Sequence, residues 1–131
     1  MKSIAAVVVV GGVVLMAARP VVAHHAFAAE FDAAKPVKLT GAVTKVDWTN
    51  PHAWIYVDIK DETGKVANWG FELASPNGLM RNGWTRFSLK PGEVVTIEGT
   101  RAKNGSTNAN AAAVIIASTG QKLFAGSSQP Q

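Results

Sequence analysis

The sequence has no cysteine among its 131 residues. This excludes a disulfide framework and an N-terminal lipid attached through cysteine, so the folded chain must be stable through its core alone or with a ligand or metal. Long apolar runs are also lacking: the longest, Ile4 to Ala18, has fifteen residues and is interrupted only by glycines. Because a spanning helix needs roughly 20 apolar residues, we expect no stable membrane span.

Motifs of catalysis are missing as well. Ser75, Ser88 and Ser106 lie in no nucleophile-elbow pattern, and no phosphate loop or His-Glu-x-x-His segment occurs. The carboxylates of the expected strands are scattered, as outward residues usually are. The sequence therefore predicts a binding or accessory protein and no catalytic residue.

The first 23 residues have the layout of a secretory signal peptide. Lys2 is a short positive region, the apolar run follows, and Arg19-Pro20 ends it. Small residues then allow cleavage after Ala23 or after Ala28. Ala23 is favoured because it lies five residues beyond the run, against ten for Ala28. A Sec-type route to the periplasm is predicted, with a retained anchor as the alternative.

Removal of this segment changes the charge of the chain. The full sequence has 13 Lys and Arg against 9 Asp and Glu, a net charge of +4, but two of the bases lie in the first 23 residues. The remaining 108 residues carry a net charge of only +2. Since binding to nucleic acid depends on clustered positive charge, we expect no nucleic-acid partner.

The processed chain is long enough for one domain. An alanine-rich N-terminal arm is expected over residues 24–36, a β-domain over 37–118 and a C-terminal tail over 119–131, disordered from about residue 125. Turn residues recur every ten to fifteen positions in the β-domain. They separate five expected strands, over residues 37–48, 53–60, 66–73, 94–100 and 111–117, and one expected helix over residues 75–83.

Hydrophobic alternation assigns faces to these strands. Ala53, Ile55, Val57 and Ile59 are expected to point inward, and the first strand loses its alternation near Lys45-Val46, as a β-bulge would cause. Ser75 and Pro76 suit the first positions of a helix, and Gly83 suits its end. The order β-β-β-α-β-β predicts an all-β fold with little helix, a five-stranded OB-like Greek-key barrel. Another small β-barrel or half-open sheet with this order is the alternative.

Several stretches of the sequence form a recognisable set. They are His24-His25-Ala26-Phe27 with Glu30-Phe31-Asp32, residues 41–54 with the core Val46-Asp47-Trp48-Thr49-Asn50-Pro51-His52, and residues 69–86 and 89–99. In these stretches the chain resembles a family of small exported bacterial proteins known only as a domain of unknown function. The resemblance implies a periplasmic protein with an OB-like barrel, and it supplies no activity, substrate or catalytic residue.

The three histidines suggest a metal site. Cleavage after Ala23 would give His24 a free α-amine beside its imidazole, and nitrogen ligands in a tetragonal arrangement suit copper(II). His25 and His52 are the further candidate ligands, because the arm is long enough to return to the loop that holds His52. The alternative is a solvated terminus and a loop histidine bonded to backbone.

The outward face of the second expected strand suggests a second kind of site. Trp54 and Tyr56, with Trp48 nearby, are expected to form an aromatic platform beside Asp47, Asn50 and Asp58. Such surfaces stack on planar or sugar-like ligands. The alternative is that the helix or the arm covers them with Phe27 and Phe31. The hypotheses are therefore a copper-binding protein, a binder of a small organic ligand or partner protein, and a non-catalytic subunit of a periplasmic enzyme complex.

Overall fold

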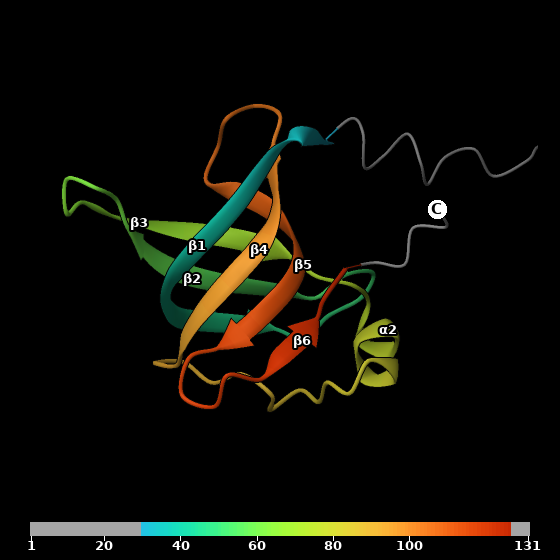
Figure 1. Ribbon diagram of the computed structural model, residues 1–131. Helices are drawn as coiled ribbons and strands as arrows, with labels where there is room; N and C mark the ends of the chain where they lie inside the picture. Colours follow the sequence, from blue (N-terminus) through green and yellow to red (C-terminus); the bar gives the residue numbers. More distant parts are fainter. Residues whose placement is uncertain (1–29, 127–131) are drawn as a thin grey trace, which may run out of the picture.

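The protein is described by a computed structural model over residues 30–126, and it is all-β with one short helix (Figure 1). Six strands form one sheet in the order β3-β2-β1-β4-β5-β6. Their bounds are β1 Phe31–Asp47, β2 Trp54–Lys60, β3 Val66–Glu72, β4 Val94–Ala102, β5 Asn108–Ile116 and β6 Lys122–Phe124, and the helix is α2 Pro76–Arg81. No helix in this part of the chain is long and apolar enough to cross a membrane.

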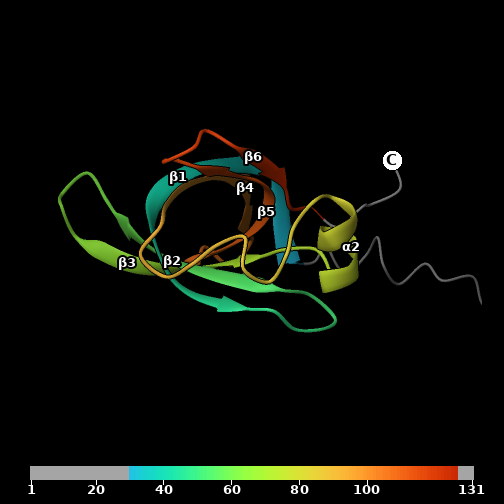
Figure 2. The ribbon, with the colours of Figure 1, turned by 90° about the horizontal axis from the view of Figure 1, so that it is seen from below.

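The pairing of the strands makes the sheet curl. Neighbours pair antiparallel, and β3 also pairs in parallel with β5 through Gly70, Phe71 and Glu72. Each of β1 to β5 therefore has at least two neighbours. Seen from below, β1, β4 and β5 curve along one side and β2 and β3 lie along the other (Figure 2). The helix α2 lies at one end of the molecule, beside the chain that leaves β3.

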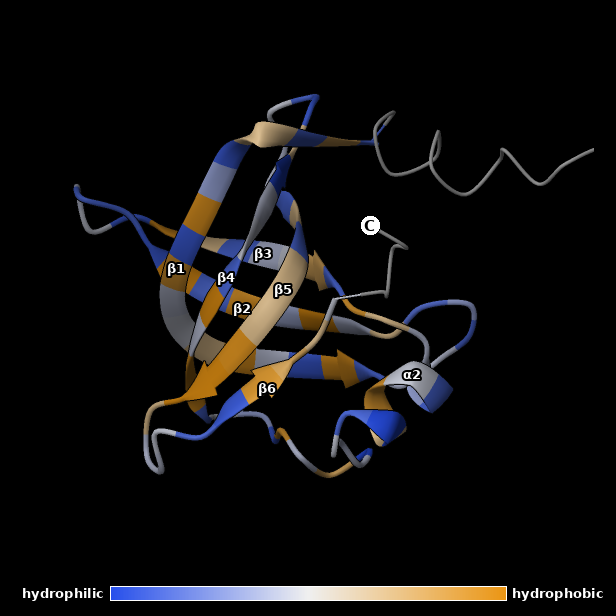
Figure 3. Cartoon of the chain, turned by 45° about the vertical axis from the view of Figure 1, so that its right-hand side comes forward, coloured by the Kyte–Doolittle hydropathy of each residue, from blue (hydrophilic) through white to orange (hydrophobic). Residues whose placement is uncertain are grey.

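The core lies inside this curl and follows the predicted alternation. Ala53, Ile55 and Val57 are fully buried and Ile59 almost so, opposite buried residues of β4 and β5 such as Ile97. The alternating colours along β2 and the hydrophobic end of β5 are visible in Figure 3. The predicted inward face of β2 is thus confirmed.

The predicted irregularity of the first strand is a β-bulge at Thr44. Val43 pairs with Val57 and Lys45 pairs with Tyr56, so Thr44 is an extra residue in β1. An extra residue reverses the side to which the following side chains point. Val43 faces the core before the bulge, whereas Val46 and Trp48 pack against the core after it.

The start of the predicted helix is confirmed. The hydroxyl of Ser75 accepts a hydrogen bond from the backbone N–H of Gly78 at 3.2 Å, and Pro76 stands in the first turn. Gly83 has a φ of +89°, the left-handed conformation expected just beyond a helix end. Leu79 is fully buried and fixes the helix on the core.

Two predictions about the ends of the domain are wrong. The first strand begins at Phe31 and not at residue 37, and a sixth strand, β6, follows the five that were expected. Ala125, expected in a disordered tail, is buried, donates a hydrogen bond to Ala112 O and accepts one from Ala74 N. The signal peptide, residues 24–29 of the arm, and residues 127–131 of the tail lie outside the described residues.

Candidate functional site

The first element of the candidate site is a contact between a histidine and a carboxylate beside the sheet. His52, in the loop between β1 and β2, places its Nδ1 2.5 Å from Oε1 of Glu72 at the end of β3. The β2–β3 register sets Glu72 opposite Trp54, so the pair lies next to that aromatic ring. The Glu72 side chain is only 12% exposed, against 40% for His52.

The buried position of Glu72 changes its acidity. Burial raises the pKa of Glu72 above its ordinary value, and the negative charge of Glu30 acts in the same direction. The charge of His52 and its hydrogen bond to the carboxylate oppose this rise. The Glu72 carboxyl is therefore the group on which the charges of Glu30 and His52 act in opposite directions.

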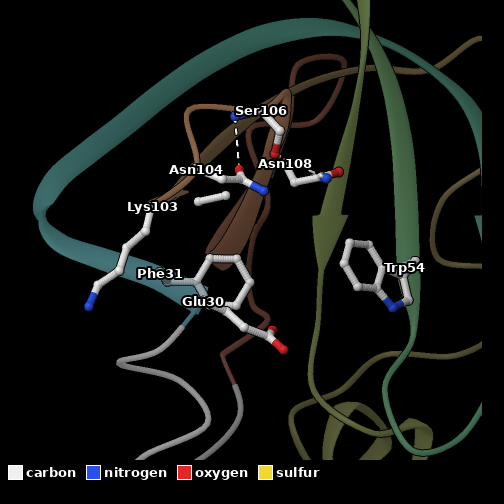
Figure 4. Close-up of a pocket in the computed structure, with 8 residues that line it drawn as sticks. Glu30, Phe31, Trp54, Lys103, Asn104, Ser106 and Asn108 are labelled. Atoms are coloured by element: carbon white, nitrogen blue, oxygen red, sulfur yellow. Dashed lines mark hydrogen bonds between the residues drawn. The ribbon is translucent and has the colours of Figure 1, made fainter.

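Beside this pair lies a cavity of about 540 Å³ (Figure 4). Phe31 from β1 and Trp54 from β2 lie on opposite sides of it, and polar side chains from the β4–β5 loop and the start of β5 occupy a third side. The lining residues are Glu30, Phe31, Trp54, Ala102, Lys103, Asn104, Ser106 and Asn108. An aromatic wall with a few polar groups is the usual composition of a small-molecule site.

The β4–β5 loop is held in shape by its own hydrogen bonds. Gly105 has a φ of +72°, which allows the tight turn that Asn104-Gly105 predicts. The Asn104 Oδ1 accepts from the backbone N–H of Ser106 at 3.0 Å, and Arg101 Nη2 donates to Gly105 O at 2.9 Å. These bonds fix the polar side of the cavity.

The outward face of β2 carries the predicted aromatic pair. The rings of Trp54 and Tyr56 are stacked, with centroids 6.5 Å apart and planes inclined by 19°. Gly70 of β3 lies beneath them: a Cβ there would come within 2.8 Å of Asn108 Oδ1 and 3.3 Å of Tyr56 Cε1. The absence of a side chain at Gly70 therefore leaves room for the aromatic pair beside Asn108.

The other predicted ligand residues are placed differently. Trp48 packs against the core, because the bulge at Thr44 turns it inward, and so it does not extend the outward platform. Asp47 stands opposite Trp54 and forms an ion pair of 3.3 Å with Lys45, and Asn50 is exposed in the β1–β2 loop. Asp58 accepts a hydrogen bond from Asn68 Nδ2 at 2.9 Å.

Of the predicted metal ligands, only His52 can be placed. His24 and His25 lie outside the described residues. Within residues 30–126 no group of three His, Cys, Asp or Glu side chains is arranged to hold a metal. The partner of His52 in this part of the chain is Glu72.

Sequence reasoning missed Phe31, Glu72 and the loop residues as parts of one site. Asn104-Gly105 was recognisable as a turn, but nothing in the sequence shows that this turn approaches Trp54. A second cavity, of about 390 Å³, lies on the helix side of His52 and was not predicted. It is lined by His52, Ala74, Ser75, Gly78, Arg81, Asn82 and Gly126.

Comparison with known proteins gives a family without an activity. Residues 11–111 match the family described as Family of unknown function (DUF6152). No curated protein and no solved structure matches the chain. Since the match covers most of the sequence, the chain belongs to this family of unknown function.

Proposed function

We propose that the protein is an exported, periplasmic binding or accessory protein that holds a small organic ligand between Phe31 and Trp54. The observation that carries this proposal is the placement of the two aromatic rings on opposite sides of a 540 Å³ cavity. Aromatic faces bind the planar or apolar part of a ligand, and Asn104, Ser106 and Asn108 supply hydrogen-bonding groups for its polar part.

The topology supports an OB-like Greek-key barrel for this protein. The parallel β3–β5 pairing joins the third and fifth strands, so the pairings β1-β2-β3-β5-β4-β1 return to their starting strand. OB folds bind ligands on the face of strands 2 and 3 and on the loops after strands 1 and 4. Trp54 on β2, His52 in the loop after β1 and residues 103–107 after β4 occupy these positions.

The signal-peptide layout of residues 1–23 supports export, and the lack of any catalytic motif supports binding over catalysis. In this proposal the protein either delivers the ligand to a partner protein or signals to that partner that the ligand is bound. A non-catalytic subunit of a periplasmic enzyme complex would act in the same way.

A fragment screen by ¹H–¹⁵N NMR tests the site. Small neutral and charged ring compounds at millimolar concentration should shift the amide signals of Phe31, Trp54, Ser106 and Asn108. Trp54→Ala should abolish these shifts. Phe124→Ala, which removes a 63% exposed aromatic side chain on β6, should leave them intact. Fragment shifts that persist in Trp54→Ala, or a screen without any shift at this cavity, would overturn the proposal.

A second candidate function is copper binding through His24, His25 and His52. One observation favours it: Glu72 holds Nδ1 of His52, which orients the ring and leaves Nε2 as the nitrogen for a metal, as carboxylates beside metal-binding histidines do. The intact mass of the processed protein, with and without copper(II), should then show a chain that begins at His24 and carries one copper. Copper binding that is unchanged in a His24→Ala, His52→Ala double variant contradicts this candidate.

A further inference from the structure

The cavity between Phe31 and Trp54 has acidic groups on one side. Glu30 is one of its lining residues, and in Figure 4 its carboxylate extends from the Phe31 side toward Trp54. Glu72 stands opposite Trp54 in the β2–β3 register, so its side chain lies on the same face of the sheet as that ring. One carboxylate therefore lines the aromatic-walled space, and a second lies beside one of its walls.

The positive charges near this space are differently placed: Arg101, at the end of β4, donates to Gly105 O and lies over the Trp69 ring. Lys103 is the cationic residue among those that line the cavity, and Figure 4 shows its ammonium group directed away from the space between the two rings. His52 contacts Glu72 and neutralises it when the imidazole is protonated. Within residues 30–126, no side-chain nitrogen of Lys, Arg or His lies within 4.0 Å of the Glu30 carboxylate.

Aromatic rings and carboxylates together recognise one class of ligand. The face of an indole or phenyl ring attracts a cation through its quadrupole, and the attraction grows when the cation is removed from water. A carboxylate adds a charge-assisted hydrogen bond to an ammonium N–H. An anion would meet Glu30 and Glu72 with like charge and would gain nothing from the ring faces.

We infer that the ligand is an organic ammonium cation whose apolar or planar body lies between Phe31 and Trp54, with its positive charge toward Glu30 and Glu72. This inference rests on the proposed ligand site and adds the charge of the ligand to it. Asn104, Ser106 and Asn108, on the third side of the cavity, accept or donate hydrogen bonds to the remaining polar groups of the ligand.

Three probes of similar size and different charge test the inference: 2-phenylethylammonium, neutral 2-phenylethanol and anionic phenylacetate. Each is titrated at neutral pH and low salt into the processed protein and followed by NMR at the Trp54 and Asn108 signals. The ammonium probe should bind about tenfold or more tightly than the alcohol, a ratio that corresponds to about 1.4 kcal/mol. Phenylacetate should bind more weakly than the alcohol.

Glu30→Gln removes one charge at an exposed residue and should reduce the ratio between ammonium and alcohol affinities several-fold, mainly by weakening the binding of the ammonium probe. Glu62→Gln, at an exposed position in the turn between β2 and β3, removes the same charge away from the cavity and should leave the ratio unchanged. Equal binding of ammonium and alcohol would overturn the cation inference and leave the proposed ligand site standing. Tighter binding of phenylacetate, or binding of none of the probes, would also overturn the inference, whereas the fragment screen decides the site itself.

Discussion

Nδ1 of His52 and Oε1 of Glu72 lie 2.5 Å apart, and this contact joins the β1–β2 loop to the end of β3 beside Trp54. The loop carrying His52 is thereby held at the edge of the aromatic cavity. The same carboxylate feels the charge of Glu30, a residue that lines the cavity. The contact between His52 and Glu72 thus lies beside one wall of the cavity that Glu30 lines.

Glu72→Gln should change how stability depends on pH. Burial raises the pKa of Glu72, helped by Glu30 and opposed by His52, so the folded state retains its proton above the ordinary value of 4.5. Glu72 therefore contributes its full stabilisation to the folded state below pH 4.5. This contribution is lost as pH rises through the folded-state pKa of Glu72. As pH rises above 4.5, urea unfolding should show the variant gaining stability relative to the original chain.

Asp61→Asn provides a control of opposite sign. The hydroxyl of Thr63 and the backbone N–H groups of Thr63 and Lys65 donate hydrogen bonds to Oδ1 of Asp61, and the pKa of this carboxyl is lowered despite some loss of hydration. Its stabilising contribution is present above the ordinary pKa and is lost as pH falls through the lowered value. As pH rises, the free energy of unfolding of the original chain should therefore increase relative to that of the Asp61→Asn variant. If the stability of both variants, relative to the original chain, changes in the same direction as pH rises, the interpretation of Glu72 is wrong.

Gly99→Ala should destabilise the sheet severely. A Cβ at Gly99 would lie 2.0 Å from Asn110 O, where β4 and β5 change register, and a backbone atom cannot move aside cheaply. We expect a loss of about 3 kcal/mol or more in the free energy of unfolding. Gly126→Ala, whose Cβ would meet its nearest atom at 3.9 Å, should change stability by less than about 1 kcal/mol. Equal changes in the free energy of unfolding of the two variants would contradict the close approach of β4 and β5 at Gly99.

Ser75→Ala should weaken the start of α2. The variant loses the hydrogen bond from Gly78 N to the Ser75 hydroxyl, and a lost N-cap costs about 1 kcal/mol. Ser118→Ala, at an exposed position in the turn between β5 and β6, is the matched control. Thermal or urea unfolding measures both. A Ser75→Ala variant as stable as the control would contradict the assigned cap.

The fold was predictable where one face of an element is buried. The alternation in β2 gave the correct inward residues, and Ser75-Pro76 with Gly83 gave the helix, because these signals are local. The start of β1 was missed because residues 33–36 are exposed and show no alternation. The sixth strand was missed because its three residues are too few to show a period.

The candidate site was only half predictable, for a physical reason. Trp54 and Tyr56 follow from the alternation of β2, but Trp48, expected near them, packs against the core because the bulge at Thr44 reverses the side that later residues face. The cavity itself combines residues from β1, β2 and the β4–β5 loop. No local pattern brings such residues together, since only the strand pairing places them side by side.

The indole N–H signals offer the most direct test of an organic ammonium ligand held between Phe31 and Trp54. The chain has four tryptophans, and single Trp→Phe variants assign their four signals in a ¹H–¹⁵N spectrum. On titration with 2-phenylethylammonium, the Trp54 signal should move in a saturable way. The Trp84 signal should stay in place, because Trp84 is not among the residues that line the cavity and its N–H donates to Phe124 O at 2.9 Å. A ligand at this site is contradicted if the Trp84 signal shifts in a saturable way while the Trp54 signal does not. It is also contradicted if the Trp54 signal shows no shift at the highest probe concentration.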